Sequence, residues 1–120
     1  MLAQAGKRYV QHACGHVREL VPLMQRDGVY GIESVSPPPT GDATIAETRQ
    51  LAGDRLAIIG GIEPTMLLNL SLSELPAYVE QVIGEGQGGP FVLANSDSCP
   101  PGVGPDKWAL IADIARGQRR

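Results

Sequence analysis

The sequence repeats one pattern four times: a short apolar segment, then a segment in which apolar residues recur at helical spacing. The apolar segments are 8–13, 30–35, 55–59 and 91–94. The helical segments are 16–27, a stretch from Asp42 or Thr44 to Ala52, a stretch from Ser71 or Ser73 to Gly84, and a last one from Pro105. Continuous apolar strands alternating with amphipathic helices are typical of a parallel sheet covered by helices. The pattern therefore predicts an α/β fold with about four parallel strand–helix units.

Proline and glycine residues predict where these elements end. Three prolines at 37–39 exclude a helix or inner strand from the loop 36–42, because each lacks a backbone donor. Pro22 predicts either a kink in the helix over 16–27 or a late start of that helix. Gly60 and Gly61 are expected to stop the third strand.

Length and composition predict one folded domain, residues 1–120. The chain has 120 residues, a usual size for one domain, and its 42% of hydrophobic residues is enough for a core. A net charge of −3 gives no basis for binding nucleic acid, which requires clustered Lys and Arg. No apolar run approaches the roughly 20 residues that span a membrane, and the start lacks the order of a signal peptide. We therefore expect a cytoplasmic protein without a nucleic-acid or membrane partner.

Two cysteines and one histidine form a candidate metal site. His12 and Cys14 are two residues apart at the end of the first apolar segment, so on an extended strand both side chains point to the same side. Cys99 follows the fourth apolar segment, and the two strand ends meet if the sheet curves. Three ligands with an open fourth position are the pattern of a catalytic zinc site. The alternative is two buried cysteines and a hydrogen-bonded histidine; a Cys14–Cys99 disulfide is disfavoured in a reducing compartment.

Two glutamates follow the second and third apolar segments and are candidate catalytic residues. Glu33 and Glu63 are placed to transfer protons or to position a substrate. The alternatives are a surface carboxylate beside the proline loop for Glu33 and a solvated one beside Pro64 for Glu63.

Two other polar residues have simpler explanations. His16 is either a fourth ligand, a proton carrier or a solvent-facing residue in the first turn of the next helix. Asp42 is expected to cap the helix that it precedes.

Chemically reactive side chains thus gather after each predicted strand, which is where a (β/α)8 barrel keeps its active site. Such a barrel needs eight units, and this chain has four.

Several motifs, in their order and spacing, resemble one family over residues 8–116. The motifs are His12-Ala13-Cys14-Gly15, Asp27-Gly28-Val29, the stretch from Glu33 to Asp42, the stretch from Gly60 to Pro64, and Ser98-Cys99-Pro100. Together they resemble the C-terminal half of the uroporphyrinogen decarboxylase superfamily. The motifs are most similar to its cobalamin-dependent branch, the methylcobamide:coenzyme M methyltransferases.

The resemblance implies the C-terminal half of a (β/α)8 (TIM) barrel and a function. In the methyltransferase branch a His-x-Cys pair and a distant Cys bind zinc, roles that fall on His12, Cys14 and Cys99. A thiol substrate becomes the fourth ligand, and a methylated corrinoid, which a corrinoid protein can carry, donates the methyl group. The decarboxylase branch implies a metal-free enzyme acting on a tetrapyrrole, and a third alternative is a non-catalytic remnant that binds a ligand.

The resemblance also implies partners, because half a barrel leaves two free strand edges and one uncovered face. We therefore expect a homodimer, or pairing with a missing N-terminal half.

Overall fold

Four parallel strands form one sheet in the computed structural model, which describes residues 2–117. The strands are β1 (Val10–His12), β2 (Gly31–Val35), β3 (Ala57–Ile62) and β4 (Phe91–Asn95). They lie side by side in chain order, β1-β2-β3-β4, and every neighbouring pair is parallel. The predicted α/β architecture with four parallel strands is confirmed.

Helices connect the strands. They are α1 (Leu20–Arg26), α2 (Ile45–Ala52), α3 (Pro64–Asn69), α4 (Leu75–Glu85) and α5 (Pro105–Gly117), with a short 3-10 turn, η1 (Ala3–Ala5), near the start. Among the described residues, no helix combines the length and the apolar character that a membrane crossing requires.

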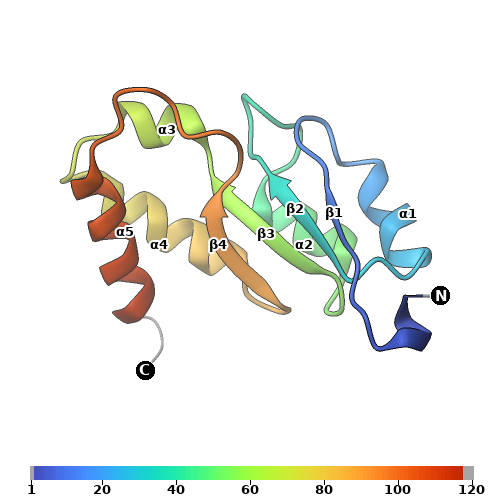
Figure 1. Ribbon diagram of the computed structural model, residues 1–120. Helices are drawn as coiled ribbons and strands as arrows, with labels where there is room; N and C mark the ends of the chain where they lie inside the picture. Colours follow the sequence, from blue (N-terminus) through green and yellow to red (C-terminus); the bar gives the residue numbers. More distant parts are fainter. Residues whose placement is uncertain (1, 118–120) are drawn as a thin grey trace.

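All the strand connections cover the same face of the sheet. Crossovers between parallel strands are right-handed, so strands that follow one another in chain order keep their helices on one side. Figure 1 shows α2 and α4 behind the sheet, with α1 beside the β1 edge and α5 beside the β4 edge. No described helix lies on the other face, which is called the open face below.

The strand register shows which side chains occupy the open face. His12, Glu33, Ile59 and Val92 are register partners across the four strands, so they share one face. Ile32, the neighbour of Glu33, packs instead in the core beneath the helices. Val92 is 53% exposed, so the open face leaves apolar surface in contact with solvent.

The core lies between the sheet and the helices in two clusters. The first joins strand residues such as Ile32 and Ile58 to Ile45 of α2 and Val82 of α4. In the second cluster, Ile62 of β3 packs against Leu67, Leu75, Val79 and Ile111. These contacts hold α3, α4 and α5 against the end of β3. Burying each such side chain contributes roughly 1.5–3 kcal/mol.

The prediction that Gly60 and Gly61 stop the third strand is wrong, because β3 continues through both to Ile62. Their φ angles are 143° and 102°, values that side chains rarely allow. A Cβ on Gly60 would lie 2.6 Å from the Val35 carbonyl oxygen, and one on Gly61 would lie 2.5 Å from Val82 Cγ1. The two glycines therefore let β3 approach β2 and α4 closely.

The first helix starts later than predicted, at Leu20 instead of residue 16. Pro22 was expected either to kink this helix or to mark a late start, and the late start is observed. Pro22 lies in the first turn of α1, where its missing N–H breaks no hydrogen bond of the helix. His16 is exposed to solvent, as one of its predicted alternatives states. It precedes α1, however, and does not lie in the first turn of that helix.

The N-cap of α2 is Thr44, not Asp42. Thr44 accepts a hydrogen bond from the Glu47 N–H, and the Glu47 carboxylate accepts one from the Thr44 N–H. This reciprocal pair is a capping box. It satisfies two donors at the helix start and leaves the Asp42 carboxylate free for another contact.

One buried cation holds the amino end of the sheet together. The Arg49 guanidinium donates to the carbonyl oxygens of Gly53, Leu56 and Pro90, which join the end of α2 to the segments before β3 and β4. Only 8% of Arg49 is exposed, and burial lowers the pKa of its guanidinium.

Replacing Arg49 with methionine keeps most of the side-chain volume and removes all three hydrogen bonds. Each carbonyl left without a donor costs about 1–3 kcal/mol, so Arg49→Met should lower the free energy of unfolding by roughly 2–4 kcal/mol in urea denaturation. The exposed Arg55 provides a matched control, and Arg55→Met should stay within about 0.5 kcal/mol of wild type. Equal effects of the two variants would contradict the role of Arg49.

Candidate functional site

The residues predicted to carry chemistry lie at the carboxyl ends of the strands. Because the strands are parallel, the loops that follow them meet at one edge of the sheet, the upper edge in Figure 1. The loops after β1 and β2 lie over the right half of that edge, and the loops after β3 and β4 over the left half.

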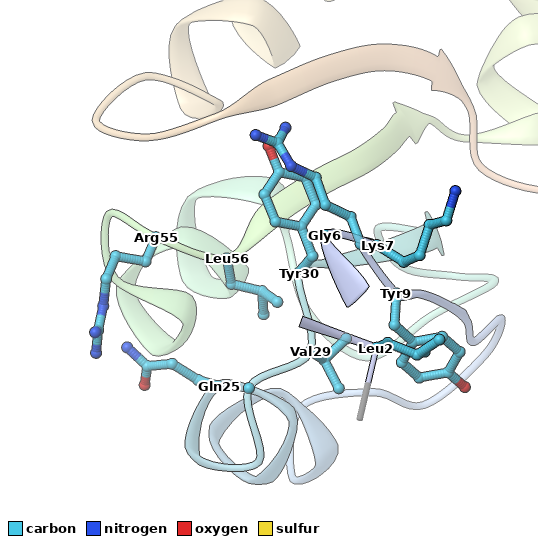
Figure 2. A pocket seen from close by; sticks show the side chains of 11 residues that line it. Leu2, Gly6, Lys7, Tyr9, Gln25, Val29, Tyr30, Arg55 and Leu56 are labelled. Atoms are coloured by element: carbon cyan, nitrogen blue, oxygen red, sulfur yellow. The ribbon is translucent and has the colours of Figure 1, made fainter. Parts of the chain in front are cut away.

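A hollow of about 510 Å³ lies at the opposite, amino end of the sheet (Figure 2). It is lined by residues that precede strands, among them Lys7, Tyr30 and Arg55. In Figure 2 the Lys7 and Arg55 side chains point away from each other, so their charges do not converge on one ligand. The carboxyl ends of the strands are therefore the better candidate site.

His12 and Glu33 form the one close contact between predicted site residues. His12 is the last residue of β1, and its register partner in β2 is Glu33. His12 Nδ1 lies 2.6 Å from Glu33 Oε2. An ionised carboxylate only accepts hydrogen bonds, so beside it Nδ1 is the ring nitrogen that carries a proton and donates it. In the neutral ring this tautomer leaves the Nε2 lone pair free. Both side chains are partly exposed, at 62% and 45%.

The two cysteines are free and exposed but lie at opposite edges of the sheet. Cys14 follows β1, near His12, whereas Cys99 follows β4, which is three strands away. Neighbouring strands are about 4.8 Å apart, so β1 and β4 are separated by roughly 14 Å in the sheet. Zinc ligands lie only about 2.0–2.3 Å from the metal. Within residues 2–117, no three His, Cys, Asp or Glu side chains are grouped closely enough to hold a metal ion.

The loop that carries Cys14 is tied to the loop after β2 through Asp42. Asp42 Oδ1 accepts hydrogen bonds from the backbone N–H groups of Val17 (2.8 Å) and Arg18 (3.2 Å). Burial acts to raise the pKa of Asp42, but these two donors and the nearby His16 outweigh it and lower that pKa. Asp42 thus caps the segment that leads into α1, which corrects its predicted role at α2.

Gly41 allows the same two loops to touch. A Cβ at this position would overlap the carbonyl oxygen of Ser36 and lie 3.0 Å from that of Gly15. The proline-rich loop therefore packs directly against the residue that follows Cys14.

Ser96, which sequence reasoning missed, joins the carboxyl ends of β2, β3 and β4. It is fully buried; its hydroxyl accepts from the Gly61 N–H (3.1 Å) and donates to the Ile62 carbonyl oxygen (3.0 Å). Its own carbonyl oxygen accepts hydrogen bonds from the hydroxyls of Ser34 and Ser36 in the β2 strand end. A serine two residues after an apolar run was the available signal. Its partners, 34 and more residues away, were not readable from sequence.

Glu63 is buried at the start of α3, with only 1% exposed. Its carboxylate accepts from the hydroxyls of Thr40 (2.6 Å) and Thr65 and from the Met66 N–H (2.9 Å). Burial acts to raise its pKa, but these donors outweigh burial and lower the pKa below the usual glutamate range. Glu63 therefore caps α3 and links it to the proline loop. The alternative of a solvated carboxylate beside Pro64 is excluded, and the catalytic role of Glu63 stays a prediction.

In comparisons with known proteins, the chain matches no family model and no curated protein sequence. The resemblance to the uroporphyrinogen decarboxylase superfamily therefore rests on the motifs themselves.

Ser96→Ala tests the junction of the three strand ends. The change leaves the buried Gly61 N–H without its acceptor, which costs about 1–3 kcal/mol of unfolding free energy. Ser98 is exposed and provides the matched control in the same loop, so Ser98→Ala should unfold at the wild-type urea midpoint. A wild-type midpoint for both variants would show that the junction does not stabilise the fold.

Glu63→Gln tests the pKa shift of Glu63. A carboxyl group whose pKa is lowered by folding stabilises the protein above its unfolded pKa, here 4.5, and that stability is lost as pH falls through the folded pKa. Wild type should therefore lose more unfolding free energy between pH 7 and pH 3 than Glu63→Gln, measured by denaturation at each pH. Glu80 is exposed, and Glu80→Gln should show the wild-type pH dependence. The same slope in Glu63→Gln would contradict the shift.

Proposed function

We propose that this chain is a four-strand portion of a (β/α)8 barrel related to the uroporphyrinogen decarboxylase superfamily. Its activity would be zinc-dependent transfer of a methyl group from a methylated corrinoid to a thiol. His12, Cys14 and Cys99 are the proposed zinc ligands. Glu33 is the proposed residue of the substrate mouth, and the buried Glu63 is proposed to position the loops around it.

The single-sided covering of the sheet supports the barrel. Doubly wound sheets reverse their strand order and carry helices on both faces, whereas a barrel keeps strands in chain order and its helices outside. This sheet has the order β1-β2-β3-β4 and its helices on one face. The open face then corresponds to the inside of a barrel.

The contact between His12 and Glu33 is the observation that carries the proposed metal site. Metal-binding histidines commonly donate their second ring N–H to a carboxylate, which fixes the tautomer and aims the other nitrogen at the metal. The 2.6 Å contact at Nδ1 leaves Nε2 available, and the exposed Cys14 follows two residues later in the chain. This is the arrangement that a zinc ligand at the end of β1 requires.

The donor set fits zinc. One imidazole nitrogen and two thiolates are typical zinc ligands, and three protein ligands leave a position for a substrate. Zinc at this site would lower the pKa of a bound thiol and so supply a thiolate that accepts the methyl group at neutral pH.

The chain's own groups orient the ligands and the substrate. Glu33 holds the His12 ring through Nδ1, and its exposed carboxylate would receive the proton that a thiol loses. Glu63 acts through the loops: by binding Thr40 it fixes the proline loop, which packs beside the Cys14 loop.

Zinc content is the direct test. We expect about one zinc per chain by mass spectrometry of the purified protein, and less than a tenth of that in Cys14→Ser, Cys99→Ser and His12→Ala. Both cysteines and His12 are exposed, so these changes should leave the urea midpoint near the wild-type value. His16 is a second exposed histidine outside the proposed ligand set, and His16→Ala is the control that should keep its zinc.

Activity separates the proposal from its alternatives. The zinc-loaded protein should transfer methyl groups from methylcobalamin to a small thiol, followed by the absorbance change of the corrinoid. A metal-free protein that decarboxylates a tetrapyrrole would instead identify the decarboxylase branch. A protein that binds zinc without either activity would identify a binding domain.

A further inference from the structure

Ser34 has a backbone conformation that it shares with no other described residue except glycines. Its φ angle is 74°, and every other positive φ angle in residues 2–117 belongs to a glycine. A residue with a Cβ rarely adopts this left-handed region, because the Cβ comes too close to backbone oxygen atoms. Such a conformation persists only where surrounding contacts impose it, and residues of this kind are concentrated at functional sites.

Ser34 is the extra residue of a β-bulge in β2. In the pairing of β2 with β3, Glu33 is opposite Ile59 and Val35 is opposite Gly60. Ser34 lies between these two pairs and has no register partner of its own in β3. A bulge of this kind bends the strand and changes the direction of its side chains.

The bulge changes the faces of the sheet that the neighbours of Ser34 occupy. In a regular strand, residues two positions apart point to the same face. Here Glu33 lies on the open face, in contact with His12. Val35 is fully buried and packs with Ile32 in the core on the helix side of the sheet. The extra residue at position 34 is what makes both placements possible.

Contacts with two other segments hold the bulge in place. Ser34 is 3% exposed, and its hydroxyl donates a hydrogen bond to the carbonyl oxygen of Ser96, in the loop after β4. The neighbouring strand β3 approaches the bulge so closely that a Cβ on Gly60 would lie 2.6 Å from the Val35 carbonyl oxygen. Gly60 therefore leaves the space that the bulged strand requires.

We infer that Ser34 is a positioning residue for the His12–Glu33 pair: its left-handed bulge turns the Glu33 carboxylate towards His12 and so sets the tautomer of the imidazole ring. The inference rests on the proposed function for the use of this pair, and it does not require a bound metal. Val35 is anchored in the core, whereas the Glu33 side chain is 45% exposed. A loss of the bulge is therefore absorbed by Glu33, which then leaves His12 without its acceptor.

The tautomer of His12 is measured by NMR correlation of the carbon-bound ring protons with the ring nitrogens. The protein is kept in mildly alkaline buffer, where free histidine is neutral. Wild-type His12 should be protonated at Nδ1 and not at Nε2. Glu33→Ala supplies the spectrum of His12 without its acceptor. The exposed His16 is observed in the same spectra and should keep one tautomer ratio in every variant.

Two substitutions separate the backbone conformation of Ser34 from its hydroxyl. Ser34→Ala and Ser34→Gly both remove the hydrogen bond to Ser96, and neither adds an atom to the buried site. Glycine adopts a φ angle of 74° freely, whereas alanine does not. We expect Ser34→Ala to lower the Nδ1-protonated fraction of His12 by roughly twofold or more, towards the value in Glu33→Ala. Ser34→Gly should keep the wild-type fraction.

A wild-type fraction in Ser34→Ala, or an equal loss in Ser34→Gly, overturns the inference and leaves the proposed function standing. Wild type provides a measurement that does not depend on how a variant folds. Its Ser34 should give the strong NOE between its own N–H and Hα that marks a left-handed residue, and absence of that NOE also overturns the inference. A wild type with the expected NOE and tautomer but without zinc overturns the proposed function alone.

Discussion

Ser96 is the point at which three strands are joined. Its buried hydroxyl bridges the Gly61 N–H and the Ile62 carbonyl, while its carbonyl oxygen receives the hydroxyls of Ser34 and Ser36. Because these groups are satisfied inside the protein, the strand ends form a fixed base. The loops that follow β2, β3 and β4 therefore start from one hydrogen-bonded junction. His12 lies outside this junction, at the end of β1, and is connected to it through its pairing with β2.

The covering of one face of the sheet explains which strand residues are buried and which stay exposed. Each strand connection lies on the same face of the sheet. Ile32 and Ile58 therefore lie between neighbouring strands and beneath the helices, and both are buried. The opposite face receives no such cover, and Val92 stays largely exposed. Apolar surface of this kind is stabilised by association, and in parallel sheets both faces are ordinarily covered.

The periodicity of apolar residues in the sequence predicted most of the strands and helices. Capping residues, glycines and prolines predicted where several of these elements begin or end. Helix α2 was predicted well because Thr44 begins it and Gly53 follows its end. The failures depend on tertiary contacts. Gly60 and Gly61 stand where an ordinary strand would stop, and only the nearness of Val35 and Val82 explains why β3 continues. For the candidate site, spacing placed His12 beside Cys14, but the contact with Glu33 depends on strand register and the separation from Cys99 on strand order.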